Sequence, residues 1–229
     1  LNFSHGTHGE HAEVVRRIRE GESRWGRPVA ILQDLQGPKI RIGRIEGGAV
    51  DLVSGETVCL RPGDGVGTRE VLTTTYREIA QDVEPGDRIL LDDGRLVLAV
   101  EEVEGSDIVR CRVVEGGVLK EKKGINLPGV TISTPALTEK DRADIRFGCQ
   151  HGVDYVALSF VRRREDLIEL KEEIRACSGD VPVIAKLEKP QAVENLDGIL
   201  EEADGVMIAR GDLGVELPPE RVPILQKAI

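Results

Sequence analysis

Two side chains of opposite charge stand close together at the end of an apolar stretch. Val183–Glu188 reads as a strand, and because alternate residues of a strand face the same side, Lys186 and Glu188 share one face. Barrel enzymes place their active sites at such strand ends. Burying charge is costly without a partner or a task, so the pair is either a structural ion pair or part of a catalytic site.

The next predicted strand, Gly205–Ala209, ends in a second polar turn. Its residues, Arg210–Gly214, include two glycines around Asp212. Glycines let backbone N–H groups approach an anion closely, although an ordinary Gly-Asp turn has the same composition. Glu188 and Asp212 together would be two carboxylates from adjacent strand ends. That pair suits one Mg²⁺ ion that keeps positions open for substrate oxygens.

Three further segments carry weaker signals. Asn2 and Ser4 point the same way from a short strand and offer neutral oxygens for a weakly held cation, or alternatively cap the helix that contains His11. The segment Asp34–Arg41 is again a strand end followed by a rigid turn. The basic run Lys120–Gly124 is more typical of a solvated loop than of a phosphate contact.

Elements of two kinds must position these residues. Up to residue 37 we expect a helix over His11–Glu20 and a strand over Val29–Leu35, and from residue 135 onward strands and helices alternate. Between them, short runs separated by Gly- and Asp-rich turns predict a small β-barrel. These runs are Val50–Val53, Thr57–Leu60, Arg88–Leu91, Arg95–Val100 and Ile108–Val114.

The predicted helices of the second βα region have clear signals at their ends. Thr138 and Asp141 resemble a capping box for a helix that ends near Gly148. A second helix is predicted over Glu165–Cys177, and Tyr155–Phe160 is predicted to be a strand. Repeated βα units form either a doubly wound sheet or a (β/α)8 barrel.

The predicted fold class is therefore α/β, a partial (β/α)8 TIM barrel with an inserted small β-barrel domain. The domains are expected at 1–37 (barrel strands 2–3), 38–134 (the insert) and 135–229 (barrel strands 4–6). Without the insert, too few residues remain for a full barrel, which needs roughly 200–250. The absent initiator Met and a last helix that stops early suggest a piece of a longer polypeptide.

Composition excludes several classes of function. The net charge of −10 disfavours a nucleic-acid surface, which needs clustered Lys and Arg. No apolar run approaches the roughly 20 residues of a membrane helix. The four cysteines are widely separated and show no C-x-x-C spacing, which favours a reduced, cytoplasmic protein over a zinc or disulfide framework.

Taken together, the motifs resemble those of the pyruvate kinase family, in family order over nearly the whole chain. The matching stretches are LNFSHG (1–6), DLQGPKIR (34–41), KKGINLPG (122–129), LTEKDRADIRFG (137–148), DYVALSFVR (154–162), AKLEKPQAVENL (185–196) and GVMIARGDLGVELP (205–218). The resemblance implies a (β/α)8 barrel with a β-barrel lid inserted after the third strand and a regulatory C-terminal domain.

The resemblance also implies a reaction, in glycolysis: phosphoenolpyruvate and ADP give pyruvate and ATP. Lys186 would be the catalytic residue that neutralises the phosphoryl group in flight and the enolate. It would bind substrate together with Ser159, Gly211 and Asp212, the last two through their amides. Glu188 and Asp212 would bind Mg²⁺.

The same resemblance assigns two more sites. Arg41 and Lys123 would contact the phosphates of ADP or ATP, with Lys123 delivered when the lid closes. A K⁺ site is implied as well, and its ligands would be Asn2, Ser4, Asp34 and the carbonyl of Leu35. The full-length protein would be a cytoplasmic homotetramer with no nucleic-acid or membrane partner.

One residue departs from the family pattern. Lys39 stands where K⁺-dependent members have Glu. An ammonium there can supply the positive charge that K⁺ otherwise provides, so we expect K⁺ to be dispensable.

Two alternatives stay open at this point. A Mg²⁺-dependent lyase or aldolase of pyruvate-like acids also carries Glu and Asp at barrel strand ends, but lacks an inserted β-barrel and the phosphate contacts of Arg41 and Lys123. A truncated product that binds metal and ligand without turnover is the non-enzymatic alternative.

Overall fold

The computed structural model describes residues 1–177 and 179–229, which form two compact units. The βα unit comprises Leu1–Pro38, Pro135–Leu213 and Pro223–Ile229, and the β unit comprises Lys39–Thr134 and Gly214–Val222. Residues 214–222 therefore group with the β unit, whereas the sequence assigned them to the last barrel segment. Each unit has its own apolar core.

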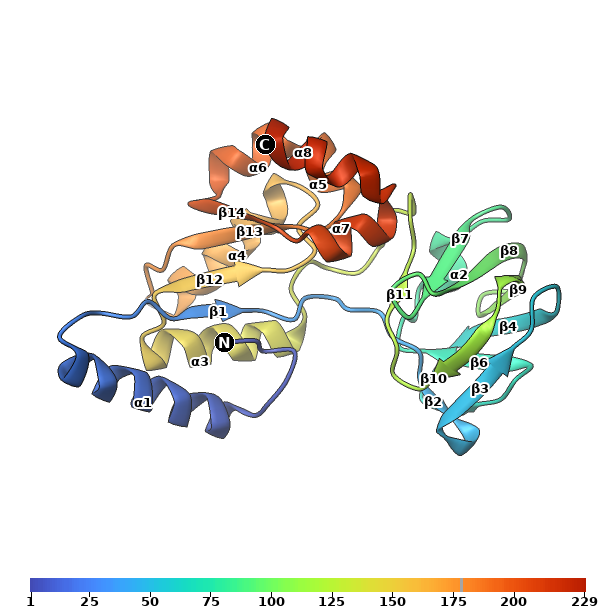
Figure 1. The fold of residues 1–229 in the computed structure, drawn as a ribbon, viewed down its shortest axis with the longest axis horizontal. Coiled ribbons are helices and arrows are strands. Elements are labelled where there is room, and N and C mark those ends of the chain that lie inside the picture. Colours follow the sequence, from blue (N-terminus) through green and yellow to red (C-terminus); the bar gives the residue numbers. More distant parts are fainter. Residues whose placement is uncertain (178) are drawn as a thin grey trace. The chain divides into compact units, whose positions relative to one another are not determined.

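A parallel sheet forms the centre of the βα unit (Figure 1). Its four strands lie in chain order: β1 (Leu32–Asp34), β12 (Tyr155–Leu158), β13 (Val183–Leu187) and β14 (Gly205–Ile208). The N-terminal segment extends the sheet, because Asn2 bridges to Asp34 in parallel and the amide of Phe3 donates to the Asp34 carbonyl at 2.9 Å.

This strand order distinguishes the two fold classes that repeated βα units allow. In a doubly wound sheet the order reverses at a switch point, whereas in a barrel each new strand is added on the same side. Here every strand pairs in parallel with its successor in the sheet, from β1 through β14. The chain is therefore an α/β protein, a partial (β/α)8 barrel with an inserted small β domain.

Helices connect these strands and bury their apolar sides against them. The core contains Val156 and Ala185 from the sheet together with Leu167 and Leu170 from α4, all essentially inaccessible to solvent. The helices are α1 (His8–Trp25), α3 (Glu139–His151), α4 (Arg164–Ala176), α5 (Pro190–Glu194), α6 (Leu196–Glu202), α7 (Arg210–Glu216) and α8 (Val222–Ala228), with a 3-10 turn η2 (Pro219–Arg221). In the described part of the chain, none of the helices combines the length and hydropathy that crossing a bilayer requires.

Helix α1 begins earlier than the sequence pattern suggested. Thr7 is its N-cap and forms a reciprocal capping box with Glu10. The side chain of Asn2 instead accepts a hydrogen bond from the amide of Ser4 at 2.8 Å. The interpretation of Asn2 and Ser4 as helix caps is therefore wrong, because Thr7 satisfies the first turn.

Helix α3 starts at the predicted capping box. Thr138 and Asp141 cap each other's backbone, and Asp141 also accepts a hydrogen bond from the amide of Gly37 at 3.1 Å. This second contact ties the start of α3 to the turn after β1. The helix continues about one turn past Gly148 and ends at Gly152, whose φ of 65° lies in the left-handed region that favours glycine.

The β unit contains one six-stranded sheet and two strand pairs. The sheet order is β11-β7-β8-β9-β4-β6, and the pairs are β10–β3 and β2–β5. The elements are β2 (Arg44–Ile45), η1 (Glu46–Gly48), β3 (Ala49–Leu52), β4 (Thr57–Pro62), β5 (Val66–Gly67), β6 (Val71–Thr74), α2 (Ile79–Asp82), β7 (Arg88–Leu91), β8 (Leu96–Glu104), β9 (Ile108–Glu115), β10 (Gly117–Lys120) and β11 (Ile125–Asn126).

One of the Gly- and Asp-rich turns that separate the predicted strands forms a hairpin after β7. Asp92, Asp93 and Gly94 all have positive φ, the conformation that tight hairpin turns require and that Asp and Gly tolerate best. The turn places β7 antiparallel to β8.

A glycine inside α3 gives a test of the packing between this helix and the sheet. A Cβ on Gly148 would overlap the side chain of Gln33, which is fully buried and whose Nε2 donates to the Asp144 carbonyl at 2.7 Å. We expect Gly148→Ala to lower the free energy of unfolding by about 1–3 kcal/mol, measured by urea denaturation.

The matched control is Gly198→Ala in α6. Its Cβ would make ordinary contact, 3.6 Å from Arg164 Cβ, so helix propensity should make it neutral or stabilising by about 0.5–1 kcal/mol. Equal effects of the two variants would contradict the packing argument.

Candidate active site

Lys186 connects the ends of three neighbouring strands of the βα unit. Its ammonium lies 2.9 Å from Oδ1 of Asp34 after β1, 2.8 Å from Oγ of Ser159 after β12, and 2.9 Å from Oε1 of Glu188 after β13. An ammonium has three N–H donors, so these contacts match its full donor capacity. The Lys186 side chain is only 13% exposed, and that of Glu188 3%.

Ser159 is held between the lysine and the first strand. Its hydroxyl donates to the carbonyl of Leu35 at 2.7 Å and lies 3.5 Å from Asp34 Oδ1. Asp34 and Leu35, which the sequence resemblance assigned to a K⁺ site, thus contact the residues that it assigned to substrate binding. No local pattern of residues indicates this juxtaposition.

Phe160 is a site residue that the sequence reasoning missed. Its amide donates to Oε2 of Glu188 at 3.0 Å, so both carboxylate oxygens of Glu188 have a partner. Phe160 has a φ of 57°, which is strained for a bulky residue and is typical of functional sites. Gly37 packs against this turn, since a Cβ on it would lie 3.0 Å from the Phe160 ring.

The carboxylates around Lys186 favour its protonated, positively charged form. Burial would lower the pKa of Lys186, but the carboxylates of Glu188 and Asp34 outweigh it and the pKa is raised. Burial raises the pKa of Glu188, and the charge of Asp212 raises it further against the opposing effect of Lys186. Burial is therefore the main reason for the raised pKa of Glu188, and Glu188 and Asp212 interact as like charges.

Gly211 and Asp212 lie in the first turn of α7, which follows β14 directly. The first hydrogen bond of this helix runs from the amide of Leu213 to the Ala209 carbonyl at 3.0 Å. Amides in the first turn of a helix have no acceptor within it. A Cβ on Gly211 would meet nothing within 4 Å, so open space adjoins this backbone.

The β unit brings its own two predicted site residues together. Arg41 pairs with Gly124 across an antiparallel bridge, and its guanidinium donates to the carbonyl of Lys122 at 3.0 Å. The ammonium of Lys123 lies 2.8 Å from Asp92 Oδ1. Lys39 belongs to the same unit and its Cε lies 3.8 Å from where a Cβ on Gly124 would be.

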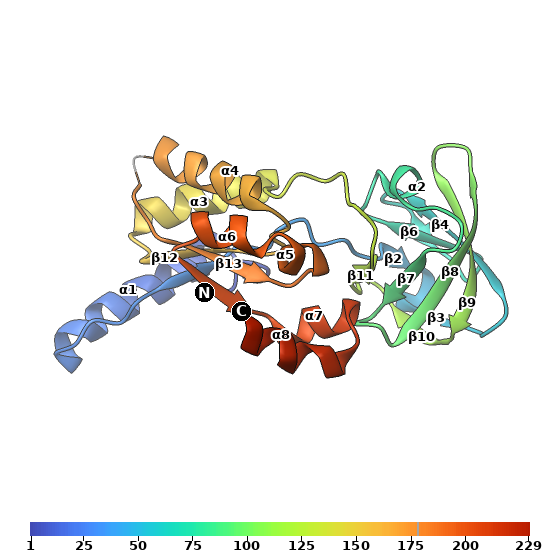
Figure 2. The same ribbon diagram turned by 90° about the horizontal axis from the view of Figure 1, so that it is seen from above.

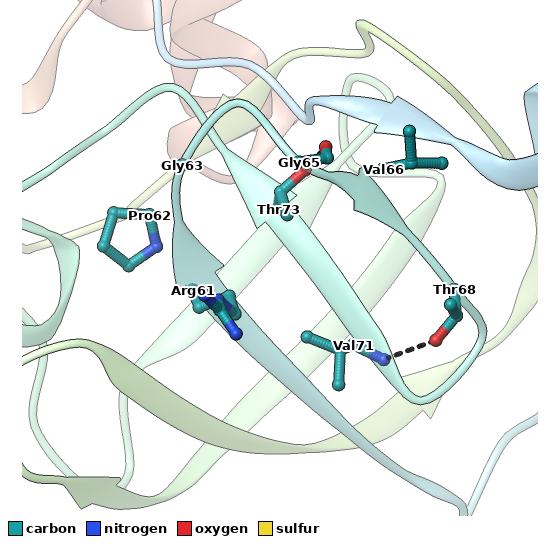
Figure 3. Close-up of a pocket in the computed structure, with 8 residues that line it drawn as sticks. All are labelled: Arg61, Pro62, Gly63, Gly65, Val66, Thr68, Val71 and Thr73. Atoms are coloured by element: carbon teal, nitrogen blue, oxygen red, sulfur yellow. Dashed lines mark hydrogen bonds between the residues drawn. The ribbon is translucent and has the colours of Figure 1, made fainter.

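A cavity of about 340 Å³ elsewhere in the β unit does not involve these residues (Figure 3). Arg61, Thr68, Val71 and Thr73 are among the residues that line it, and Thr68 accepts a hydrogen bond from the amide of Val71. The lining of this cavity includes none of the predicted site residues, so we assign the cavity no part in the predicted chemistry.

Comparison with known proteins identifies the family. A family model described as the barrel domain of pyruvate kinase matches residues 1–229. The pyruvate kinase of Corynebacterium glutamicum is 52% identical over 228 residues, which cover 99% of this chain and 48% of the relative. The chain belongs to the pyruvate kinase family.

Other relatives agree. The pyruvate kinase of Mycobacterium tuberculosis strain H37Rv is 50% identical over 227 residues, covering 99% of this chain and 48% of the relative. That of Geobacillus stearothermophilus is 48% identical over 232 residues, covering 100% and 39%. The chain thus spans half or less of the length of these pyruvate kinases.

The Mg²⁺ that the pyruvate kinase resemblance implies fits the residues present. Glu188 and Asp212 supply carboxylate oxygens, the donors that Mg²⁺ prefers, and a bound cation would relieve the repulsion between these two like charges. Among the residues that the structure describes, His, Cys, Asp and Glu do not gather in groups of three suited to a metal. Two carboxylates are enough where substrate oxygens and water complete the shell.

The raised pKa of Glu188 predicts an unusual dependence of stability on pH. A carboxyl with a folded-state pKa above its unfolded value of 4.5 opposes folding when ionised, and this cost disappears as pH falls through the folded-state pKa. We expect Glu188→Gln to be at least as stable as the parent chain at pH 7 in urea denaturation. This advantage should shrink toward pH 4.

Glu172→Gln on the exposed side of α4 is the control and should change stability little at either pH. A clear loss of stability in Glu188→Gln at pH 7 that the control lacks would show that the ion pair with Lys186 outweighs burial.

Proposed function

We propose that the protein containing this chain transfers a phosphoryl group from phosphoenolpyruvate to ADP in glycolysis, giving pyruvate and ATP. The observation that carries this proposal is the position of the Lys186 ammonium, which contacts Asp34, Ser159 and Glu188 at the strand ends. The carboxylate of Asp212 is near enough to act on the charge of Glu188. Membership of the pyruvate kinase family supports it. The resemblance further supports a cytoplasmic homotetramer as the full-length assembly.

Lys186 would provide electrostatic stabilisation of the reacting groups. Its ammonium is held on three sides before substrate arrives, so little reorganisation is needed when negative charge develops on the phosphoryl group and the enolate. Ser159, whose hydroxyl is fixed between Leu35 and Lys186, would help to position the substrate beside the ammonium.

Glu188 and Asp212 would hold Mg²⁺, which when bound polarises the oxygens of the phosphoryl group. The Phe160 amide fixes the orientation of the Glu188 carboxylate before any ligand binds. The first-turn amides of Gly211 and Asp212 would bind the substrate carboxylate, because N–H groups at the start of a helix favour negative charge.

Arg41 and Lys123 would bind the phosphates of ADP or ATP. The β unit holds them on two neighbouring segments, which are joined by the bridge between Arg41 and Gly124. The ion pair of Lys123 with Asp92 must open or be shared when a phosphate binds.

The proposed K⁺ site is already partly satisfied by protein donors. Asn2 Oδ1 accepts from the Ser4 amide, the Leu35 carbonyl accepts from Ser159, and Asp34 accepts from Lys186. Together with Lys39 in place of Glu, these contacts support activity without K⁺.

The main test is an assay of the full-length protein. Release of pyruvate from phosphoenolpyruvate should require ADP and yield an equal amount of ATP. Lys186→Met should lower kcat by about 10²–10³-fold, the usual effect of removing one group that stabilises charge in the transition state. Lys227→Met on the exposed side of α8 is the control and should retain activity. Pyruvate release without ADP would indicate a lyase instead.

A second test concerns Lys39. We expect the parent enzyme to reach full velocity in K⁺-free buffer of constant ionic strength, and Lys39→Glu to need K⁺ with a stimulation above about tenfold. Lys120→Glu, on an exposed position of β10, controls for the change in net charge. Strong stimulation of the parent enzyme by K⁺ would contradict the role of Lys39.

A further inference from the structure

Helices α3 and α4 pack side by side (Figure 2), and each contains or directly precedes one of two cysteines that are distant in the sequence. Arg142 on α3 forms ion pairs with Glu169, at 2.5 Å, and with Glu173 on α4. Cys149 lies two helical turns after Arg142 on the same face of α3, and Cys177 lies one turn after Glu173. The register that the ion pairs set therefore aligns the two thiols.

Direct contacts agree with this register. A Cβ on Gly179, two residues after Cys177, would lie 3.0 Å from the sulfur of Cys149. Both cysteines are free, half-buried and packed against the core of the βα unit. Burial raises the pKa of the Cys149 thiol, and the neighbouring Cys177 thiol raises it further.

The other two cysteines provide a built-in comparison. In the pairing of β4 with β9, Cys59 lies opposite Arg110, and Cys111 lies opposite Val58. Neighbouring positions of a strand point to opposite faces, so Cys59 and Cys111 cannot bond to each other without rearrangement of the sheet.

We propose that Cys149 and Cys177 form a modification site at which a hydroperoxide makes a reversible disulfide between α3 and α4. The oxidant takes two electrons from the thiolate of one cysteine, giving a sulfenic acid and releasing water or an alcohol. The sulfur of the other cysteine then attacks the sulfenic sulfur, loses its proton and displaces water. Two thiols and one hydroperoxide are consumed, and a dithiol reductant reverses the step.

Cys149 lies within α3, and burial raises the pKa of its thiol. Cys177 follows the last residue of α4, and its amide donates to the carbonyl of Ile174 at 3.1 Å. Either thiol can be oxidised first, because the disulfide that results is the same.

The disulfide would tether two helices that precede strands carrying site residues. Helix α3 leads into β12, which is followed by Ser159, and α4 leads into β13, which carries Lys186. Closing this loop constrains the unfolded chain, so oxidation should stabilise the βα unit. The reduced protein keeps its normal activity, because neither cysteine touches the residues around Lys186.

Peptide mapping of the full-length protein tests the proposal. After treatment with hydrogen peroxide and alkylation of the remaining thiols, trypsin should release residues 147–162 disulfide-linked to residues 176–186. Cys59 should be recovered alkylated in residues 45–69, because trypsin does not cleave between Arg61 and Pro62. Oxidation should raise the melting temperature by about 4 °C or more, and dithiothreitol should reverse the shift.

Cys149→Ser and Cys177→Ser should each abolish both the linked peptide and the thermal shift while leaving the activity of the reduced protein unchanged. Cys59→Ser is the matched control and should keep both. The proposal fails if Cys149 and Cys177 are recovered as separate alkylated thiols or as sulfinic acids. It fails also if either serine variant still shows the reversible shift.

Discussion

The structure of the candidate site depends on one ammonium group in a crowded, largely buried position. Lys186 balances Asp34 and Glu188, carboxylates from two strands, and without it the burial of Glu188 would leave an unpaired charge. This arrangement requires parallel strands whose C-terminal ends meet at one edge. The sequential order of β1, β12, β13 and β14 meets that requirement, since each strand delivers its end beside the previous one.

The backbone around this ammonium is strained in a way that serves the carboxylate. Phe160 adopts a left-handed conformation that costs free energy, and in return its amide faces Glu188. Gly37 leaves room for the turn, and its own amide is bonded to Asp141 at the start of α3. The site is thus supported by a contact between Gly37, which precedes the inserted β domain in the sequence, and Asp141, which follows it.

The β unit positions its own two predicted site residues. Arg41 forms a bridge with Gly124, the residue after Lys123, within a domain that has its own core. Their proximity therefore does not depend on the barrel. The pair of cysteines shows the opposite case. Cys149 lies on α3 and Cys177 directly follows α4, and the packing of these helices brings the sulfur of Cys149 beside the segment that carries Cys177.

Much of this protein follows from local sequence. Alternation of apolar residues places Lys186 and Glu188 on one face of a strand, the Thr138–Asp141 box starts α3, and the Asp92–Gly94 turn makes a hairpin. These features involve residues a few positions apart, whose relation is set by the geometry of a single helix, strand or turn.

Only the tertiary structure decided which distant groups meet. Ser159 and Asp34 are 125 residues apart, and their contact with Lys186 depends on the register of three strands. The positive φ of Phe160 and the meeting of Cys149 with Cys177 have no local signature either. Such contacts arise from packing between elements, and packing is determined by the whole set of buried side chains rather than by neighbours along the chain.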